Sequence, residues 1–363
     1  IRKAQREDGA LPGIIPTSGW GFDWGNGPAW DSVLFYLPYY TWVQRGDTDI
    51  IKENANAMMR YLHYISGKRD EMGLIHIGLG DWLPVNYKTP YTPLEVTDTL
   101  VTLNLCRMAE KMFAAVDMIP QSIFAGTLFD EIREDARTAL ILPDRATILG
   151  RSQTAQAMAI EFGLLEEGEK PAAFNVLLEL IHAADDHMDT GCLGARIIFH
   201  VLAKFGYADL AYNMIVRTDF PSYGFWVEKQ DATSLFEDFN SPDKSPQSKN
   251  HHFFGDISSW FFKYISGVKI NPCERNVKEV EISPNFIESL DHAEGYQNHL
   301  GGKISAEWKR QGNEINLKVT IPEGCYGFLK LPIGYVITDK GDKRLAMKPL
   351  SEGVTEYVIT KQD

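Results

Sequence analysis

The sequence has few of the features that mark a membrane, nucleic-acid or metal-binding protein. No apolar run approaches the roughly 18 residues of a membrane span. Aspartate and glutamate (49) outnumber lysine and arginine (36), and the formal net charge of -13 would repel a phosphate backbone. The nine histidines are scattered and form no ligand pattern. We therefore expect no nucleic-acid partner, no membrane partner, no metal and no cofactor.

Cysteine is also scarce. The four residues Cys106, Cys192, Cys273 and Cys325 lie far apart, without the spacing of a zinc site or a redox CxxC, so we expect all four to be free core residues. The chain begins at Ile1 with no signal peptide before it, and we expect a piece of a longer protein. The oligomeric state and the compartment stay open, with a periplasmic or secreted location favoured over the cytoplasm.

The 363 residues exceed the usual size of a single core, which predicts one large and one smaller domain. Between residues 29 and 266, apolar residues at helical spacing alternate with Gly- and Pro-rich loops, which predicts successive helical hairpins. The expected helices cover residues 29–45, 49–65, 93–118, 120–140, 152–162, 168–184, a segment ending near 205, 207–216 and 256–266. Residues 220–227 (FPSYGFWV) are expected to be extended or loop, and residues 73–92 a long loop.

The hairpins show no sequence repeat of roughly 34 or 40 residues, which argues against a solenoid. Paired helices with long loops at one end resemble an (α/α)6 toroid, in which the loops build a central pocket. From Val268 onward the pattern changes to alternating apolar and polar residues with Gly-Asn, Pro-Glu-Gly and Lys-Gly-Asp turns, which predicts an antiparallel β-sandwich. We place a helical domain at residues 1–268, incomplete at its start, and the sandwich at 269–363.

One polar loop carries the main candidate for chemistry. Glu237 follows the apolar residues of DATSLFEDF, and a Pro-containing loop then leads to His251 and His252. Carboxylates carry out sugar hydrolysis as acid and base, so Glu237 is a candidate for one of the pair. The alternative is a solvated glutamate. The two histidines are expected to point to opposite sides of an extended chain.

Aromatic residues gather in two other loops. GWGFDWGNGPAWD places Trp20, Phe22, Trp24 and Trp30 among glycines, and GDWLP pairs a carboxylate with the ring of Trp82. Flat rings suit the apolar faces of sugars. They also suit a plug over the core, and an aspartate in a turn often caps its own backbone.

The order of these motifs resembles the inverting α-L-rhamnosidases of glycoside hydrolase family 78, over nearly the whole chain. The matching stretches are AQREDGALPGIIP, GPAWD, GDTDIIKENANAMMRYLHYI, GDWLP, DTGCLGA, FPSYGFWV, DATSLFEDF and NHHFFGDISSW. The resemblance implies an (α/α)6 catalytic barrel followed by a β-sandwich. It also implies removal of terminal α-L-rhamnose from glycosides or polysaccharides, in a bacterial protein.

The resemblance also implies roles for individual residues. Glu237 matches the family's catalytic base. His251 matches a contact to the sugar, and Trp30, Asp31 and Trp82 match positions that line the rhamnose pocket. The family's acidic segment, which carries the general acid, is expected to lie ahead of this chain. Loss of a general acid lowers the rate by about 10²- to 10⁴-fold, so this chain is expected to be inactive alone.

Three departures and two alternatives accompany this interpretation. Phe236 replaces the family's tryptophan before the catalytic glutamate, and Ser234 replaces a threonine. The family's glycine between the tryptophan and the aspartate is absent, so Trp30 is followed directly by Asp31. One alternative is another toroid enzyme, a polysaccharide lyase or an unsaturated-glucuronyl hydrolase. The other is a non-catalytic carbohydrate-binding protein, unless Asp31 or Asp81 serves as the acid.

Overall fold

The computed structural model describes residues 1–87, 92–338 and 344–362. The chain forms two compact units. The first comprises Ile1–Trp42, Asp47–Val201 and Met214–Phe254, and the second comprises Val43–Gly46, Leu202–Asn213 and Gly255–Asp363. Part of the predicted 73–92 loop and the predicted Lys-Gly-Asp turn at 340–342 lie outside the described residues. None of the helices in the described ranges combines the length and apolar character needed to cross a membrane.

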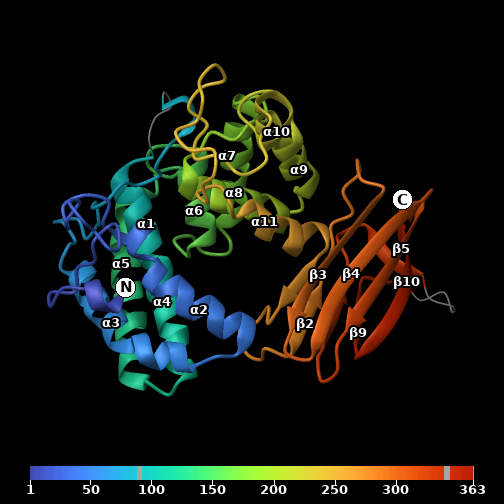
Figure 1. Ribbon diagram of the computed structural model, residues 1–363, viewed down its shortest axis with the longest axis horizontal. Coiled ribbons are helices and arrows are strands. Elements are labelled where there is room, and N and C mark those ends of the chain that lie inside the picture. The colour runs from blue at the N-terminus through green and yellow to red at the C-terminus, as the bar shows by residue number, and fades with distance from the viewer. Residues whose placement is uncertain (88–91, 339–343, 363) are drawn as a thin grey trace. The chain divides into compact units, whose positions relative to one another are not determined.

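Most of the helices fall where the apolar periodicity predicts them, although one helix occupies the predicted loop at 220–227 and the predicted helix 29–45 is divided into two. The helices are α1 (Pro28–Asp31), α2 (Val33–Arg45), α3 (Asp49–Ser66), α4 (Leu94–Ala115), α5 (Ile119–Leu140), α6 (Gln153–Glu161), α7 (Lys170–Ala183), α8 (Cys192–Lys204), α9 (Ala208–Val216), α10 (Tyr223–Gln230) and α11 (Ile257–Trp260), with short 3₁₀ turns at Arg2–Ala4 and Val85–Tyr87 and a π-helical turn at Phe261–Ile265. In the first unit, α4 packs along α5 and α6 along α7 as antiparallel pairs (Figure 1).

Helix α4 lies at the centre of the first unit because it is buried on nearly every side over most of its length. From Val96 to Ala109 every residue except Arg107 is buried, polar residues such as Asp98 included. Helix α3, by contrast, is amphipathic, with Ile51, Met58 and Leu62 buried on one face and charged residues on the other. A helix buried on all sides must be surrounded by others, so α4 organises the packing of this unit.

One predicted loop is in fact a helix. Residues 220–227 were expected to be extended or loop, and that prediction is wrong from Tyr223 onward, where α10 begins. The hydroxyl of Ser222 accepts a hydrogen bond from the backbone N–H of Phe225 (3.0 Å) and caps the helix. Tyr223 and Trp226 are then buried one turn apart, so packing of large rings stabilises a short segment with little helical periodicity.

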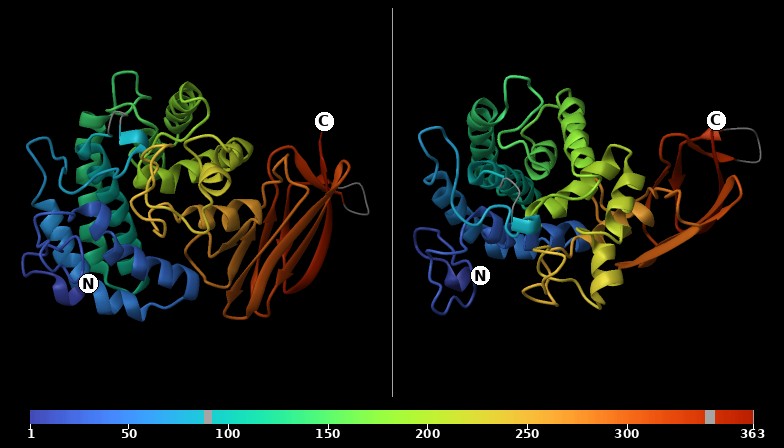
Figure 2. Two further views of the ribbon diagram at one scale, coloured as in Figure 1. Left: turned by 45° about the horizontal axis from the view of Figure 1, so that its top comes forward. Right: turned by 90° about the horizontal axis from the view of Figure 1, so that it is seen from above.

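The second unit contains two β-sheets, with strands in the order β1-β2-β6-β9 and β3-β4-β5-β10-β7-β8 (Figures 1 and 2). The strands are β1 (Val268–Ile270), β2 (Glu279–Ile282), β3 (His292–His299), β4 (Gly302–Gln311), β5 (Glu314–Ile321), β6 (Tyr326–Lys330), β7 (Tyr335–Thr338), β8 (Arg344–Leu345), β9 (Met347–Leu350) and β10 (Gly353–Lys361). The pairing of β2 with β6 is parallel, and the other pairings of the described strands are antiparallel.

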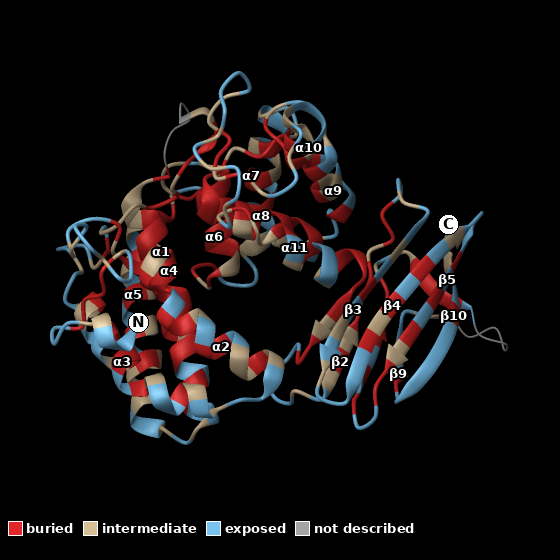
Figure 3. Ribbon diagram, in the orientation of Figure 1, coloured by how far each residue is buried: buried red, intermediate tan, exposed pale blue. Residues whose placement is uncertain are grey.

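Alternation along the strands builds the core of this unit. Buried and exposed residues alternate along β4 and β5 (Figure 3), and the predicted Gly-Asn turn joins these two strands with Gly312 at φ +61°. Trp308 is fully buried, with its ring 5.5 Å from that of Phe286 and its indole N–H bonded to the carbonyl of Ile265. Strand β1 begins at Val268, and we keep the domain boundary between residues 268 and 269 as a proposal.

The cysteine prediction is confirmed in part. All four thiols are free, and Cys106, Cys192 and Cys325 are buried, but Cys273 is exposed. Cys273 lies in the loop between β1 and β2, outside the strands whose inward faces form the core of this unit. Burial raises the pKa of the Cys106 thiol to about 12, so that group is an inert apolar side chain at neutral pH.

Candidate functional site

Glu237 lies in a segment that pairs with the return of its own loop. The backbone N–H of His251 donates to the carbonyl of Leu235, and the N–H of Glu237 donates to the carbonyl of Ser248, both at 2.9 Å. The hydroxyl of Ser234 adds a bond to the carbonyl of Lys249. These bonds hold the two predicted residues Glu237 and His251 on neighbouring, oppositely directed segments of one loop.

Two buried rings anchor this loop to the first unit. Phe236 and Phe239 are almost fully buried, and the ring of Phe239 stacks on Trp226 with centroids 3.8 Å apart and planes 5° apart. Trp226 also contacts Phe236 and Phe254. Because Glu237 stands between two buried phenylalanines, its partly exposed carboxylate is held at the surface of an aromatic cluster.

Asp238 fixes the rest of the loop, a role that the sequence analysis missed. Its carboxylate is 3% exposed and accepts hydrogen bonds from the backbone N–H groups of Asn240 (3.1 Å) and Gln247 (3.0 Å). The side chain of Asp238 therefore joins the two ends of the loop that runs from Asn240 to Gln247. The sequence signal available was an aspartate two residues before an asparagine, which is a common local turn.

His251 does not lie as predicted relative to His252. The two rings stack, with centroids 5.0 Å apart and planes 9° apart, so the expectation of opposite sides is wrong. The chain turns after His251 and is not extended there, which brings both rings to one side. The N–H of Phe253 bonds to Nδ1 of His251 (3.3 Å), which places the proton of the neutral ring on Nε2.

The charge state of His251 depends on its surroundings. Burial lowers the pKa of His251, the carboxylate of Glu237 opposes this by raising it, and His252 lowers it further. The ring is therefore neutral at pH 7 and offers Nε2–H as a hydrogen-bond donor. A neutral donor beside a carboxylate suits contact with a sugar hydroxyl.

Trp30 and Asp31 end the short helix α1. The ring of Trp30 lies edge-on to Phe253 at 6.1 Å, and Phe253 in turn lies 3.9 Å from the ring of His251. The structure thus brings Trp30 to the His251 side of the Glu237 loop. The substrate-contact role of Trp30 stays a prediction.

The carboxyl group of Asp31 faces protein. It is 3% exposed, and its Oδ2 accepts hydrogen bonds from the N–H of Gly27 and the hydroxyl of Tyr61, each at 2.9 Å. Burial raises the pKa of Asp31 to about 7, although both hydrogen bonds act to lower it. This carboxyl group closes the turn that orients Trp30, and its predicted contact with substrate stays a prediction.

Trp82 follows an aspartate that binds another helix. Asp81 is buried, and its carboxylate accepts bonds from the N–H groups of Gly191 (2.7 Å), Leu193 (2.9 Å) and Gly194 (3.0 Å), all at the N-terminus of α8. It also accepts a bond from the hydroxyl of Thr154. The carboxylate therefore satisfies unpaired N–H groups of α8 and not its own turn.

This contact explains why GDWLP and DTGCLGA occur together. The carbonyl of Trp82 accepts a bond from the N–H of Cys192 (2.9 Å), and a Cβ on Gly191 would lie 2.4 Å from the carbonyl oxygen of Asp81. Only glycine allows so close an approach. The missed signal was Gly191, which directly precedes α8 and has no side chain that could accept from the first N–H groups of the helix.

The Trp82 loop is joined to the Glu237 loop. The N–H of Asn86 donates to the carbonyl of Phe239 at 3.0 Å. The ring contact of Trp82 in the described part of the chain is with Trp24, at 6.3 Å and 87°. The backbone, and not the ring of Trp82, connects these two predicted parts of the site.

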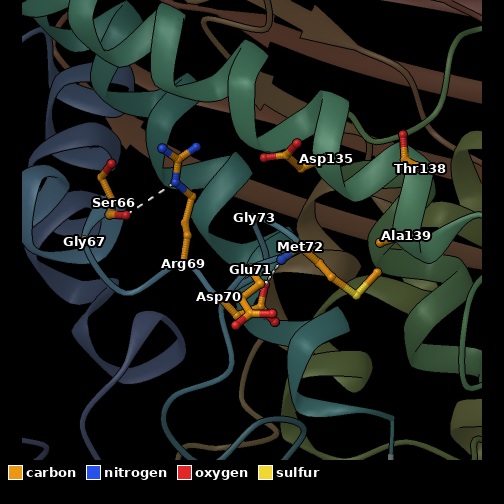
Figure 4. Close-up of a pocket in the computed structure, with 10 residues that line it drawn as sticks. All are labelled: Ser66, Gly67, Arg69, Asp70, Glu71, Met72, Gly73, Asp135, Thr138 and Ala139. Carbon is orange, nitrogen blue, oxygen red and sulfur yellow. Dashed lines mark hydrogen bonds between the residues drawn. The ribbon is translucent and has the colours of Figure 1, made fainter.

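Two other features lie away from these residues. An open hollow between the end of α3 and α5 is lined by Arg69, Asp70 and Asp135 among others, and none of the predicted residues lines it (Figure 4). The guanidinium of Arg69 there is bonded to the carbonyl of Ser66 (3.3 Å). The hollow is lined by charged side chains and has none of the aromatic surface expected for a sugar site.

Within the described ranges, Asp185, His187 and Asp219 bring potential metal ligands within 4.8 Å of one another. Nε2 of His187 lies 3.3 Å from the carboxylate of Asp219. However, Arg217 pairs with Asp219 (2.8 Å) and Asp185 (3.2 Å) and already supplies the balancing positive charge. We assign no metal to this group.

Comparison with known proteins identifies the family. Residues 1–265 match the model for the bacterial alpha-L-rhamnosidase 6 hairpin glycosidase domain, and residues 267–344 match the bacterial alpha-L-rhamnosidase C-terminal domain. The chain belongs to the bacterial α-L-rhamnosidase family. The resemblance inferred from the motif order is therefore confirmed.

Individual rhamnosidases cover nearly the whole chain. The α-L-rhamnosidase of Streptomyces avermitilis is 27% identical over 340 residues, and that of Formosa agariphila is 24% identical over 352; each alignment covers 92% of this chain. The chain spans only about a third of the length of these relatives, 32% and 36%. The activity of a whole rhamnosidase is accordingly a proposal for this chain.

Solved rhamnosidase structures share the fold. The structure from Dictyoglumus thermophilum has a TM-score of 0.88 at 22% identity, covering 99% of this chain and 42% of that one. The Streptomyces avermitilis structure, complexed with L-rhamnose, has a TM-score of 0.86 at 23% identity, covering 99% and 35%. These similarities confirm the predicted helical toroid followed by a β-sandwich.

Proposed function

We propose that this chain carries the general-base part of an inverting α-L-rhamnosidase site, with Glu237 as the base. The substrate class is a glycoside or polysaccharide with terminal α-L-rhamnose. The observation that supports this proposal most strongly is the pairing that holds Glu237 beside His251 on an aromatic anchor.

The chemistry assigns a distinct task to each group. Glu237 takes a proton from a water molecule whose oxygen forms a bond to the anomeric carbon, while the bond from that carbon to the leaving oxygen breaks. The leaving oxygen receives a proton from the general acid. His251, neutral with Nε2–H free to donate, binds a sugar hydroxyl. The rings of Trp30 and Trp82 contact apolar faces of rhamnose.

The reaction also requires a general acid. The resemblance implies a proton donor encoded upstream of Ile1. The two acids of this chain considered for the role are already engaged, Asp31 by Gly27 and Tyr61 and Asp81 by four donors. This engagement favours a second candidate for the chain by itself, which is rhamnose binding without catalysis.

The family match favours both candidates over a polysaccharide lyase or an unsaturated-glucuronyl hydrolase. A lyase would also release a product with a new double bond, which ultraviolet absorbance detects. A rhamnosidase releases no such product.

The test measures binding and turnover separately. L-rhamnose binding to the chain is measured by calorimetry, and release from an aryl α-L-rhamnoside by absorbance, with the first-formed anomer read by NMR. If the chain turns over, Glu237→Gln is expected to lower kcat by about 10²- to 10⁴-fold while binding persists, and the product is the β-anomer. Glu228→Gln, an exposed glutamate on α10, is the matched control.

Binding without turnover supports the second candidate. Retention of the anomeric configuration, or full turnover by Glu237→Gln, contradicts the assigned role of Glu237. Absence of both binding and turnover contradicts the proposal for this chain.

A further inference from the structure

A loop near the start of the chain is closed tightly at its base. A Cβ on Gly13 would lie 2.3 Å from the carbonyl carbon of Gly25, so the two backbones touch where the loop begins and ends. Within the loop, the N–H of Trp20 bonds to the carbonyl of Thr17 (3.0 Å), and the hydroxyl of Thr17 bonds to the carbonyl of Gly21 (2.9 Å). Residues 13–25 therefore form a compact loop with a defined shape.

Two tryptophans of this loop face solvent. Trp20 is 51% exposed and Trp24 is 40% exposed, and their ring centroids lie 4.4 Å apart with planes inclined by 36°. They do not plug the core, which was one interpretation of their sequence pattern. Adjacent exposed rings of this size form an apolar patch of the kind that marks a binding surface.

The patch continues into the proposed site. The ring of Trp24 meets the ring of Trp82 edge-on at 6.3 Å. Trp82 is the residue expected to contact rhamnose, so Trp24 and Trp20 extend the aromatic surface beyond it by successive rings. A ligand that lies on Trp82 and continues past the rhamnose unit would reach Trp24 next.

We propose that Trp20 and Trp24 form the subsite for the group to which the rhamnose is attached, and that they bind the flat apolar face of that group. The inference rests on the proposed rhamnosidase function and adds its selectivity for the leaving group. A pyranose ring presents a C–H face and an aryl group presents a π face, and both have the chemistry that an exposed indole pair recognises. A ligand that ends at rhamnose does not use this surface.

The experiment compares ligands with and without that group. Dissociation constants are measured by calorimetry for L-rhamnose, a rhamnosyl-glucose disaccharide and phenyl α-L-rhamnoside, using the full 363-residue chain with Glu237→Gln to prevent turnover. We expect Trp24→Ala and Trp20→Ala to weaken binding of the two larger ligands by about tenfold, the effect of losing one good ring contact. L-rhamnose binding is expected to change by less than about twofold. Trp24→Phe should restore much of the affinity because it keeps a flat ring.

A matched control removes an exposed ring elsewhere. Tyr296, 54% exposed on β3 in the second unit, is replaced by alanine and is expected to leave all three affinities unchanged. In the tryptophan variants, a larger loss of affinity for the disaccharide than for the phenyl glycoside indicates that the subsite binds a sugar. A larger loss for the phenyl glycoside indicates that it binds an aryl group.

Three results would overturn the proposal. If the larger ligands bind no tighter than L-rhamnose, or lose nothing in the tryptophan variants, the subsite does not exist although the proposed function stands. Equal loss for all three ligands means that the rings serve the rhamnose position or the fold. If the unsubstituted chain binds none of them, the proposed function fails and this inference fails with it.

Discussion

Replacing Asp31 by asparagine should change how the stability of the helical unit depends on pH. Burial raises the pKa of this carboxyl group from 3.8 to about 7 in the folded chain. The folded state therefore binds the proton more tightly than the unfolded state. The resulting stabilisation is fully present below the unfolded pKa and is lost as the pH rises through about 7.

The two pKa values set the magnitude. A single group with these values makes the folded chain about 2.5 kcal/mol more stable at about pH 5 than at about pH 8. Asparagine cannot ionise, and its carbonyl oxygen can accept the same hydrogen bonds from Gly27 and Tyr61. The unsubstituted chain should therefore lose about 2.5 kcal/mol of stability from about pH 5 to about pH 8, and Asp31→Asn should not. The free energy of unfolding of the variant minus that of the unsubstituted chain should rise by this amount as the pH increases.

Urea unfolding followed by far-UV circular dichroism, which reports mainly on helices, measures this difference. Asp130→Asn, which removes an exposed carboxylate on α5, serves as the control and should show no such trend. Repeating the comparison in an Asp98→Asn background removes a second buried carboxyl group, whose pKa is raised by burial and further by Asp31. A stability difference that stays constant with pH would refute the assignment of a titrating, buried Asp31.

Two further substitutions test the contacts that position the site. Asp81→Asn replaces one acceptor oxygen by an NH2 group and removes the negative charge, which leaves at least one N–H at the start of α8 without its acceptor. The free energy of unfolding should therefore fall by about 3 kcal/mol, and an unchanged urea midpoint would contradict this role. Phe239→Ala removes a fully buried ring stacked on Trp226 and should lower the free energy of unfolding by about 4 kcal/mol, with Phe239→Leu losing less. L-rhamnose affinity should fall in Phe239→Ala even at temperatures where it stays folded, and unaltered affinity would argue against anchoring of the Glu237 loop.

The sequence alone determined the parts of this protein that depend on local order. The 3.6-residue and two-residue periods of apolar residues gave the positions of the helical hairpins and of the strands, because each element buries one face whatever it packs against. The proximity of Glu237 and His251 was also predictable in outline, because the two residues belong to one loop that closes on itself. The α10 helix was not, since its stability comes from burial of Tyr223 and Trp226.

The tertiary structure alone decided what each polar side chain faces. The sequence pattern is compatible with a sugar contact for both Asp81 and Asp31. In the structure, Asp81 caps α8, more than 100 positions further along the chain, and Asp31 bonds to Tyr61 on α3. Conversely, the sequence pattern of Trp20 and Trp24 fits both a sugar contact and a plug over the core, and the fold leaves them exposed beside Trp82. Burial and hydrogen-bond partners depend on segments distant in sequence, so a local pattern fixes which groups are available and only packing decides which of them remain free to meet a ligand.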